Sequence, residues 1–179
     1  METILITKDD IRGFWTSLDK NFTEEKLMPY ILRAQQTDLK EFFGDAFYYD
    51  FVTNILDAKY QSLLNGGEYV YNGYTIYHSG VKQLLAAWSY KRILANINVS
   101  VGRASVVDKE TAESVRHEND IIFTRSQEAD SEAMRLQAEI RQFLNNERTE
   151  YPIWNRGSEV NTLNDTSFKI TKVPRHRQR

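Results

Sequence analysis

Three side chains in one short stretch have the types and the spacing that could bind a divalent metal. Glu113, His117 and Asp120 lie at positions i, i+4 and i+7, so a helix would place them on one face. Strongly charged helices often carry such triples on their solvent-facing surface, and no second cluster of ligands accompanies this one. We therefore favour a solvated helix face and expect no metal site.

The rest of the sequence carries no catalytic signature. Cysteine is absent, which excludes thiolate zinc sites and cysteine nucleophiles. The glycines of residues 65–73 lack the spacing of a phosphate-binding loop, and no Gly-x-Ser-x-Gly motif is present. We do not favour a glycosidase-type pair of catalytic carboxylates, because the acidic residues between 38 and 50 are expected to cap helices or face solvent. We expect neither a catalytic residue nor a cofactor.

The C-terminal end could bind an anionic partner. Four of the 23 basic residues and none of the 25 acidic residues lie in the last nine positions, and these four are Lys172, Arg175, Arg177 and Arg179. Such a tail could contact phosphates or an acidic protein surface, or it could be an unstructured, solubilising terminus. Both interpretations stay open. The contrast with an otherwise acidic body favours a protein partner or a neighbouring copy of the chain.

The stretch EYVYNGYTIYH, residues 68–78, predicts a β-hairpin in a chain that is otherwise helical. Asn72 and Gly73 both tolerate positive φ, as a two-residue hairpin turn requires. An isolated hairpin is marginally stable and has two exposed edges. It could fold back over the helices or pair with another subunit. Amphipathic side chains favour an interface, and the candidates are Tyr69, Tyr71, Tyr74 and Tyr77.

Helical periodicity dominates the remaining chain up to residue 145. Thr7 and Asp10 have the spacing of a capping box, so we expect the first helix after Thr7. Further helices are expected at about residues 23–43, 45–64, 80–98 and 109–145. The helix over 80–98 is the most apolar and should lie at the centre of a bundle. Valines around Gly102 indicate an extended segment or loop before the long charged helix.

These patterns predict a mainly α fold: a helical bundle with one β-hairpin, a long charged C-terminal helix and an extended C-terminal arm. We expect a helical domain over 1–150, with the hairpin at 68–78, and an arm with a basic tail over 151–179. The segment YPIW, residues 151–154, should anchor the far end of the long helix. Neither a signal peptide nor a membrane span is predicted, so we expect a protein made in the cytoplasm.

The order of these parts resembles that of the head–tail connector, or adaptor, proteins of tailed bacteriophages, especially crAss-like and other Bacteroides-infecting phages. The resemblance covers most of the chain up to Trp154. It depends on the arrangement of elements and on short pieces such as QTDLKEFFGDAFYYDF, GVKQLLAAWSY and YPIW. These pieces carry no catalytic chemistry, so the resemblance implies a structural role.

If the resemblance holds, copies of the chain form a ring, expected to be a dodecamer, beneath the portal in the neck of the virion. The ring extends the DNA channel, lets DNA pass without sequence-specific binding and offers a platform for the next tail protein. The resemblance implies that another subunit covers the hairpin and that the basic tail docks on the portal protein. Two alternatives remain: a DNA-binding or packaging accessory protein that uses the basic tail, and a metal-dependent enzyme that uses Glu113, His117 and Asp120.

Overall fold

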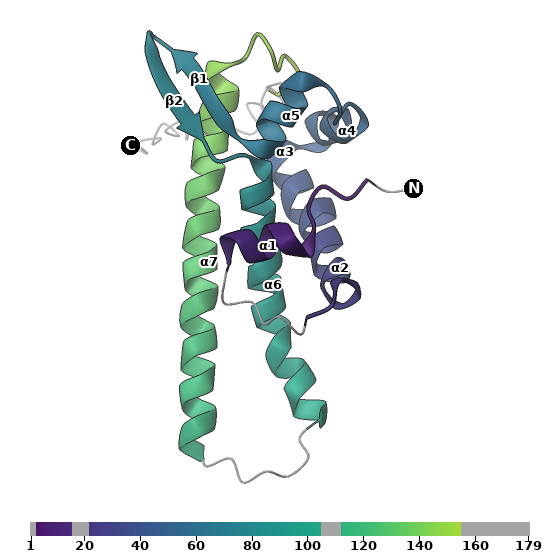
Figure 1. Cartoon of the computed structure of the whole chain (residues 1–179), viewed down its shortest axis with the longest axis vertical. Coiled ribbons are helices and arrows are strands. Elements are labelled where there is room, and N and C mark those ends of the chain that lie inside the picture. Colours follow the sequence, from purple (N-terminus) through teal and green to yellow (C-terminus); the bar gives the residue numbers. More distant parts are fainter. Residues whose placement is uncertain (1–2, 16–21, 105–111, 155–179) are drawn as a thin grey trace, which may run out of the picture.

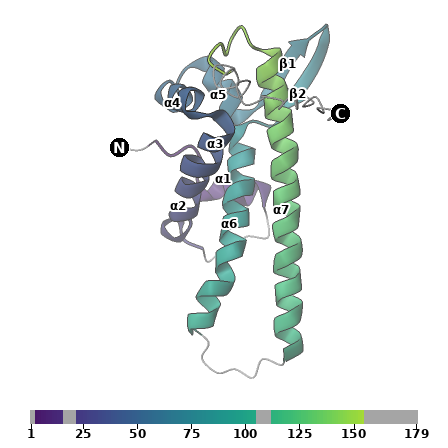
Figure 2. The ribbon, with the colours of Figure 1, turned by 180° about the vertical axis from the view of Figure 1, so that it is seen from behind.

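Two long helices form the frame of the molecule. The computed structural model describes the chain over residues 3–15, 22–104 and 112–154, and its side chains there outside 97–104 and 112–120. Helix α6 (Val81–Ala104) and helix α7 (Ala112–Asn146) run antiparallel and side by side, and the shorter elements gather around the upper half of α6 (Figures 1 and 2). The prediction of a mainly helical fold with a single hairpin is confirmed for these residues.

The first short helix begins where the capping box places it. Helix α1 (Lys8–Phe14) follows Thr7, whose backbone N–H donates to Asp10 Oδ2 over 2.7 Å, while Thr7 Oγ1 accepts from the N–H of Asp10. These reciprocal bonds satisfy backbone donors that have no partner within the helix. Ile11 is buried, and the ring of Trp15, just past the helix, stacks on Tyr90 of α6 with the centroids 4.7 Å apart.

Residues 24–43 form one continuous helical run, as predicted, but its middle turn is a π-helix. Helix α2 (Glu24–Arg33) leads into η1 (Ala34–Leu39) and then into α3 (Lys40–Phe43). Asp38 of η1 accepts two hydrogen bonds from Arg92 of α6, at 2.6 and 2.8 Å. Gly44, with φ of 73°, ends the run.

The prediction of one helix over residues 45–64 is wrong, because the first helix ends at Thr53 and a second one begins at Ala58. Helix α4 (Asp45–Thr53) and helix α5 (Ala58–Asn65) are separate elements. Asn54 donates its side-chain amide to Asp50 Oδ1 over 2.7 Å and accepts the N–H of Asp57 at 2.9 Å, so local bonds replace the helical ladder. The break lets Tyr60 of α5 fold back and donate its hydroxyl to Asp50.

The hairpin has the predicted strands and turn. Strand β1 (Gly67–Tyr71) pairs antiparallel with β2 (Tyr74–His78), with Tyr71 opposite Tyr74 and Gly67 opposite His78. Asn72 and Gly73 have φ of 52° and 81°, as a type I′ turn requires. Where the chain enters and leaves the hairpin, Gly66 and Gly80 lie against each other with φ of 82° and 81°.

Helix α6 occupies the centre, as its apolar sequence predicts, and contacts α1, α2, η1, α5 and α7. The expectation that it ends near residue 98 is wrong: the helix continues to Ala104, so Val99, Val101 and Gly102 are helical rather than extended. One glycine costs a helix only about 1 kcal/mol, and this segment contains no proline to break it. Lys91 pairs with Asp130 of α7 and ties the two long helices together.

The segment after α7 turns back onto the body, which confirms the anchoring role expected of YPIW. Tyr151 is buried and donates its hydroxyl to the backbone oxygen of Lys59 over 2.7 Å. The ring of Trp154 packs edge-on against Phe43 and Phe47, with centroids 6.0 and 5.4 Å away. The expected arm beyond Trp154 lies outside the described residues.

We predict that Gly80→Ala and Gly66→Ala each lower the free energy of unfolding by about 2 kcal/mol or more. A methyl group on Gly80 would lie 2.6 Å from the carbonyl carbon of Asn65, and one on Gly66 would lie 2.6 Å from the carbonyl oxygen of His78. Both residues also have positive φ. The measurement is urea unfolding followed by far-UV circular dichroism.

Gly13→Ala is the matched control, because no atom lies within 4 Å of a methyl group placed there and the residue is helical. This change should leave stability unchanged or raise it by about 0.5 kcal/mol. Equal stability of all three variants would show that the contact between Gly66 and Gly80 is not required.

Candidate interaction surfaces

The inner face of the hairpin is held against α7 by aromatic contacts. Because directly paired residues point to the same side, this face carries Tyr69 and Ile76, with His78 at its base and Tyr71 and Tyr74 at its tip. The ring of His78 stacks on Phe143 of α7 with centroids 3.9 Å apart, and Tyr69 meets Phe143 edge-on at 4.9 Å. Asn146 donates its side-chain amide to the Tyr69 hydroxyl over 3.2 Å. The base of the hairpin is therefore fixed on the helical body.

His78 is buried without a hydrogen-bond partner for either ring nitrogen among the described residues. Burial removes water from the charged form and lowers the pKa of His78 below its usual 6.5, while the nearby Glu139 carboxylate acts in the opposite direction. The imidazole is therefore held neutral at the base of the hairpin, where it serves as a flat ring for stacking.

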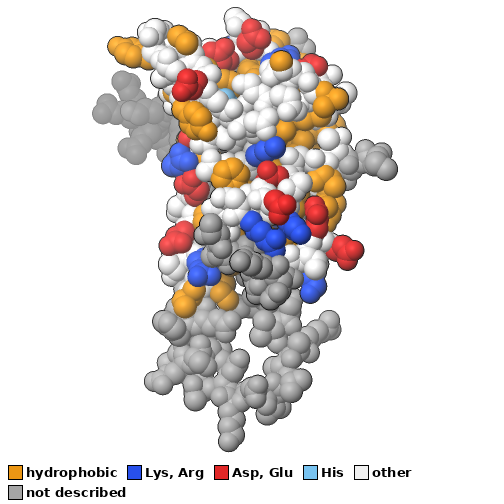
Figure 3. Space-filling view, viewed as in Figure 1, with side chains coloured by type: hydrophobic (Ala, Val, Ile, Leu, Met, Phe, Trp, Pro, Cys, Tyr) orange, Lys and Arg blue, Asp and Glu red, His pale blue; other side chains and the backbone are white. Residues whose placement is uncertain are grey.

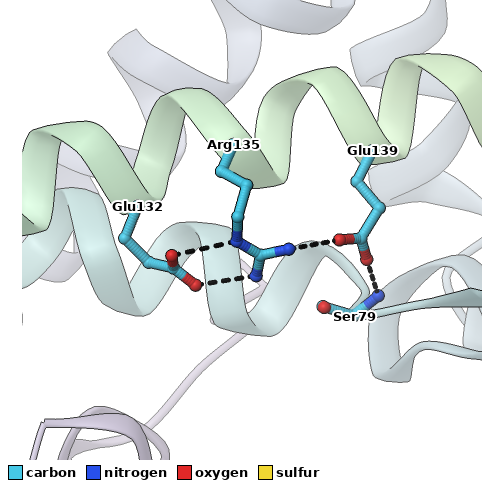
Figure 4. A network of polar contacts seen from close by, with 4 residues as sticks. All are labelled: Ser79, Glu132, Arg135 and Glu139. Carbon is cyan, nitrogen blue, oxygen red and sulfur yellow. Dashed lines mark hydrogen bonds and ion pairs between the residues drawn. The ribbon is translucent and has the colours of Figure 1, made fainter.

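A chain of polar contacts links the same point to the surface of α7 (Figure 4). Glu139 accepts the backbone N–H of Ser79, directly after β2, and a hydrogen bond from Arg135 at 2.6 Å. Arg135 also donates to both carboxylate oxygens of Glu132, at 2.7 and 3.0 Å. These contacts raise the pKa of Arg135 and lower that of Glu132. The connection between hairpin and α6 is thus fixed by charge as well as by stacking.

The outer face and the tip of the hairpin are exposed, as Figure 3 shows by the hydrophobic side chains at its upper left. Here the outer face means Glu68, Val70, Thr75 and Tyr77, and the tip means Tyr71 and Tyr74. Val70, Tyr74 and Tyr77 are 67%, 74% and 63% exposed. The sheet has two strands only, so within the described residues both outer edges lack a neighbouring strand. This surface has the composition and the free edges of a protein interface.

The structure separates the four tyrosines chosen from the sequence. Tyr71, Tyr74 and Tyr77 lie in the exposed surface, whereas Tyr69 faces α7 and is engaged by Phe143 and Asn146. Tyr69 therefore positions the hairpin within its own chain. Strand alternation places Tyr69 and Tyr77 on opposite faces, but which face meets the body depends on how the hairpin lies against α7.

The remaining candidates lie outside the described part of the chain. Lys172, Arg175, Arg177 and Arg179 belong to residues 155–179, which are not described. The backbone of Glu113, His117 and Asp120 lies in α7, as predicted, but their side chains are not described. Among the side chains that are described, no group of three His, Cys, Asp or Glu residues could hold a metal ion. No described helix is long and apolar enough to cross a membrane.

A second surface, which the sequence did not indicate, is a cleft of about 530 Å³ between the N-terminal segment and α4. We name it the α4 cleft; its lining includes Thr3, Gln35, Gln36, Lys40, Tyr49 and Val52. Tyr49 is 57% exposed there, and Ile4 beside Thr3 is also exposed. The cleft thus combines an aromatic wall, several polar groups and the ammonium of Lys40.

The π-helix η1 shapes one side of this cleft. Gln35 of η1 is fully buried, and its side-chain amide accepts the N–H of Leu5 at 3.1 Å and donates to the carbonyl of Thr3 at 2.7 Å. The N-terminal segment is thereby fixed beside η1. Such single-turn π segments often occur at functional sites. No hydrophobic period in the sequence signals this turn.

We predict that His78 makes the protein less stable in acid. The folded state holds its pKa below 6.5, so the unfolded state binds the proton more readily, and stability falls as the pH drops below 6.5. His78→Phe keeps an aromatic ring against Phe143 and removes the titrating group. The stability of this variant relative to the natural protein should therefore rise as the pH falls from about 7 to about 5.

The measurement is urea unfolding of both proteins across that pH range. Acidic residues titrate in both proteins alike, so the difference between the two curves reports His78 alone. Parallel curves would contradict a buried, neutral His78.

Comparison with known proteins places the chain in a family. The sequence profile described as Family of unknown function (DUF6712) matches residues 39–163, well over half of the chain. The match extends from the last residue of η1 through the hairpin and both long helices to beyond Trp154. No curated protein and no solved structure matches the chain. The elements that carry the exposed hairpin are thus those of the matched region, and the chain belongs to the family of unknown function DUF6712.

Proposed function

We propose that the chain is a structural head–tail connector of a tailed bacteriophage. In this role its copies form a ring beneath the portal protein, in the neck of the virion, after assembly in the host cytoplasm. The ring extends the DNA channel and carries the next tail protein. The chain acts through its surfaces and has no catalytic residue.

The observation that carries this proposal is the hairpin. A two-stranded sheet with free edges and exposed Val70, Tyr74 and Tyr77 stands on a helical body whose core is otherwise well packed. Exposed strand edges and apolar patches of this kind are usually covered by a partner. A protein that works by assembling uses such a surface to contact its neighbours.

Two further features support the proposal. The order of elements agrees with the connector resemblance found in the sequence. The chain has 25 acidic and 23 basic residues, and four of the basic ones lie in the last nine positions. The rest of the chain therefore has 25 acidic residues against 23 − 4 = 19 basic ones, so the body is acidic. A channel wall that lets DNA slide should not attract phosphates, and an acidic body meets that requirement.

The decisive experiment is the copy number of this chain in purified phage particles, measured by quantitative mass spectrometry against the portal protein. We expect parity, because a ring seated beneath the portal shares or closely follows its symmetry. The major capsid protein serves as the internal control for the measurement. Absence of the chain from particles would refute the connector proposal.

The basic tail has its own test within this proposal. A chain that lacks residues 171–179 should fold as the natural one does, since residues up to Trp154 build the described body. It should bind the portal more weakly, because Lys172, Arg175, Arg177 and Arg179 would supply the contacts. The measurement is co-sedimentation with purified portal rings, and a chain with these four residues changed to glutamine is the matched control for tail length.

Unchanged portal binding by both variants would contradict the docking role of the tail. Steeply salt-dependent binding of the natural chain to duplex DNA, lost in both variants, would instead favour the alternative of a DNA-binding or packaging accessory protein.

A further inference from the structure

The hairpin and the α4 cleft lie on opposite flanks of the molecule. In Figure 1 the hairpin projects at the upper left and α4 lies at the upper right, and after a turn of 180° the two have exchanged sides (Figure 2). One surface projects and the other is hollow, and both expose tyrosine side chains. The same chain therefore carries a projection and a recess that point away from each other.

This arrangement decides which kind of contact two copies can make. A two-fold contact uses the same patch on both copies, whereas a head-to-tail contact joins two different patches. If the projection of one copy enters the recess of the next, the two end copies of the assembly each keep one unused surface, so further copies add until the ring closes. A ring needs this geometry, and two-fold pairing of hairpins would stop at a dimer.

The charges of the two surfaces are complementary. Glu68 is the single acidic residue of the hairpin and no basic residue accompanies it, apart from the buried and neutral His78. Lys40 is the single charged residue among those described as lining the α4 cleft. Its ammonium contacts the Tyr49 hydroxyl at 3.2 Å and Asp45 at 3.4 Å, at the surface. The Lys40 side chain remains 33% exposed beside Asp45, whose own side chain is 79% exposed.

We propose that the outer face of the hairpin of one copy occupies the α4 cleft of the next copy. Glu68 then lies near Lys40, and Tyr77, which is paired directly with Glu68 and points to the same side, packs against Tyr49 and the apolar groups beside it. The free edge of the hairpin is covered by the neighbouring copy. The inference specifies the subunit contact of the proposed ring, and in that sense it rests on the proposed function.

Cysteine cross-linking tests this contact, because the natural chain has no cysteine. One full-length chain carries Thr75→Cys on the outer face, and a second chain, distinguished by a size tag, carries Thr53→Cys at the cleft; both positions are exposed. The two are mixed under conditions in which sedimentation velocity detects self-association, and are then treated with a short bis-maleimide. We expect mixed dimers at about tenfold or more the yield of either chain alone, because the contact raises the local thiol concentration.

Arg125→Cys replaces Thr75→Cys in the control mixture. This residue is exposed on α7, about 30 Å along the helix from the end that bears the hairpin. Cross-linking of Thr75→Cys chains to one another at the same yield would show two-fold pairing of hairpins and overturn the proposal. A yield of mixed dimers no higher than in the control mixture would also overturn it, as would an absence of self-association at every concentration tested.

An exchange of charges provides a second test that needs no cross-linker. Glu68→Lys and Lys40→Glu each place like charges in every contact between identical copies, so each variant alone should associate several-fold more weakly than the natural chain. A mixture of the two restores opposite charges at every contact and should regain association. If the mixture associates as weakly as its components, the two residues do not face each other.

The copy number in particles and the cross-linking yield separate the two proposals. Parity with the portal together with control-level cross-linking would keep the connector function and refute this contact. Mixed dimers from a chain that is absent from particles would keep the contact and refute the connector function.

Discussion

Burial of the middle of α6 on all its sides is the constraint on which the rest of the structure depends. Every residue from Leu84 to Tyr90 is buried, although successive residues of a helix point in different directions. Such a helix is stable in water only when other elements surround it completely. Helix α7 covers one flank, and α1, α2, η1 and α5 cover the others. The hairpin packs against α7 through its inner face, so its outer face is free to meet another molecule.

The sequence predicts best where a local rule determines the backbone. The capping box of Thr7 and Asp10, the turn at Asn72 and Gly73 and the long period of α7 all depend on neighbours within a few residues, and all are confirmed. The break between α4 and α5 was missed because apolar residues continue across it. At the break, the Asn54 side chain donates a hydrogen bond to Asp50, and Tyr60 of α5 donates its hydroxyl to the same carboxylate. Similarly, the valines around Gly102 indicate an extended segment, but α6 continues to Ala104, because a helix tolerates a single glycine.

The candidate surfaces, too, can be predicted from the sequence only in part. Strand alternation identifies which hairpin residues share a face, and the tyrosine content indicates an amphipathic surface. Which face is free is decided by Phe143 and Asn146, which come from a helix about 70 residues later in the chain. The α4 cleft depends on Gln35, whose side chain holds the N-terminal segment by two hydrogen bonds. Both outcomes are tertiary, and for this reason composition and periodicity do not reveal them.

The packing of Tyr151 and Trp154 onto the body determines how the chain can use its last residues. Trp154 donates its indole N–H to Asn145 over 3.0 Å and packs on Phe43 and Phe47, so residue 155 starts from a fixed point on the body. The 179-residue chain has 25 residues beyond this point, and a fully extended chain gains at most about 3.5 Å per residue. Covalent geometry alone therefore keeps Arg179 within roughly 90 Å of Trp154. Any partner of the four terminal cations must lie within that radius of Trp154, whichever copy or component supplies it.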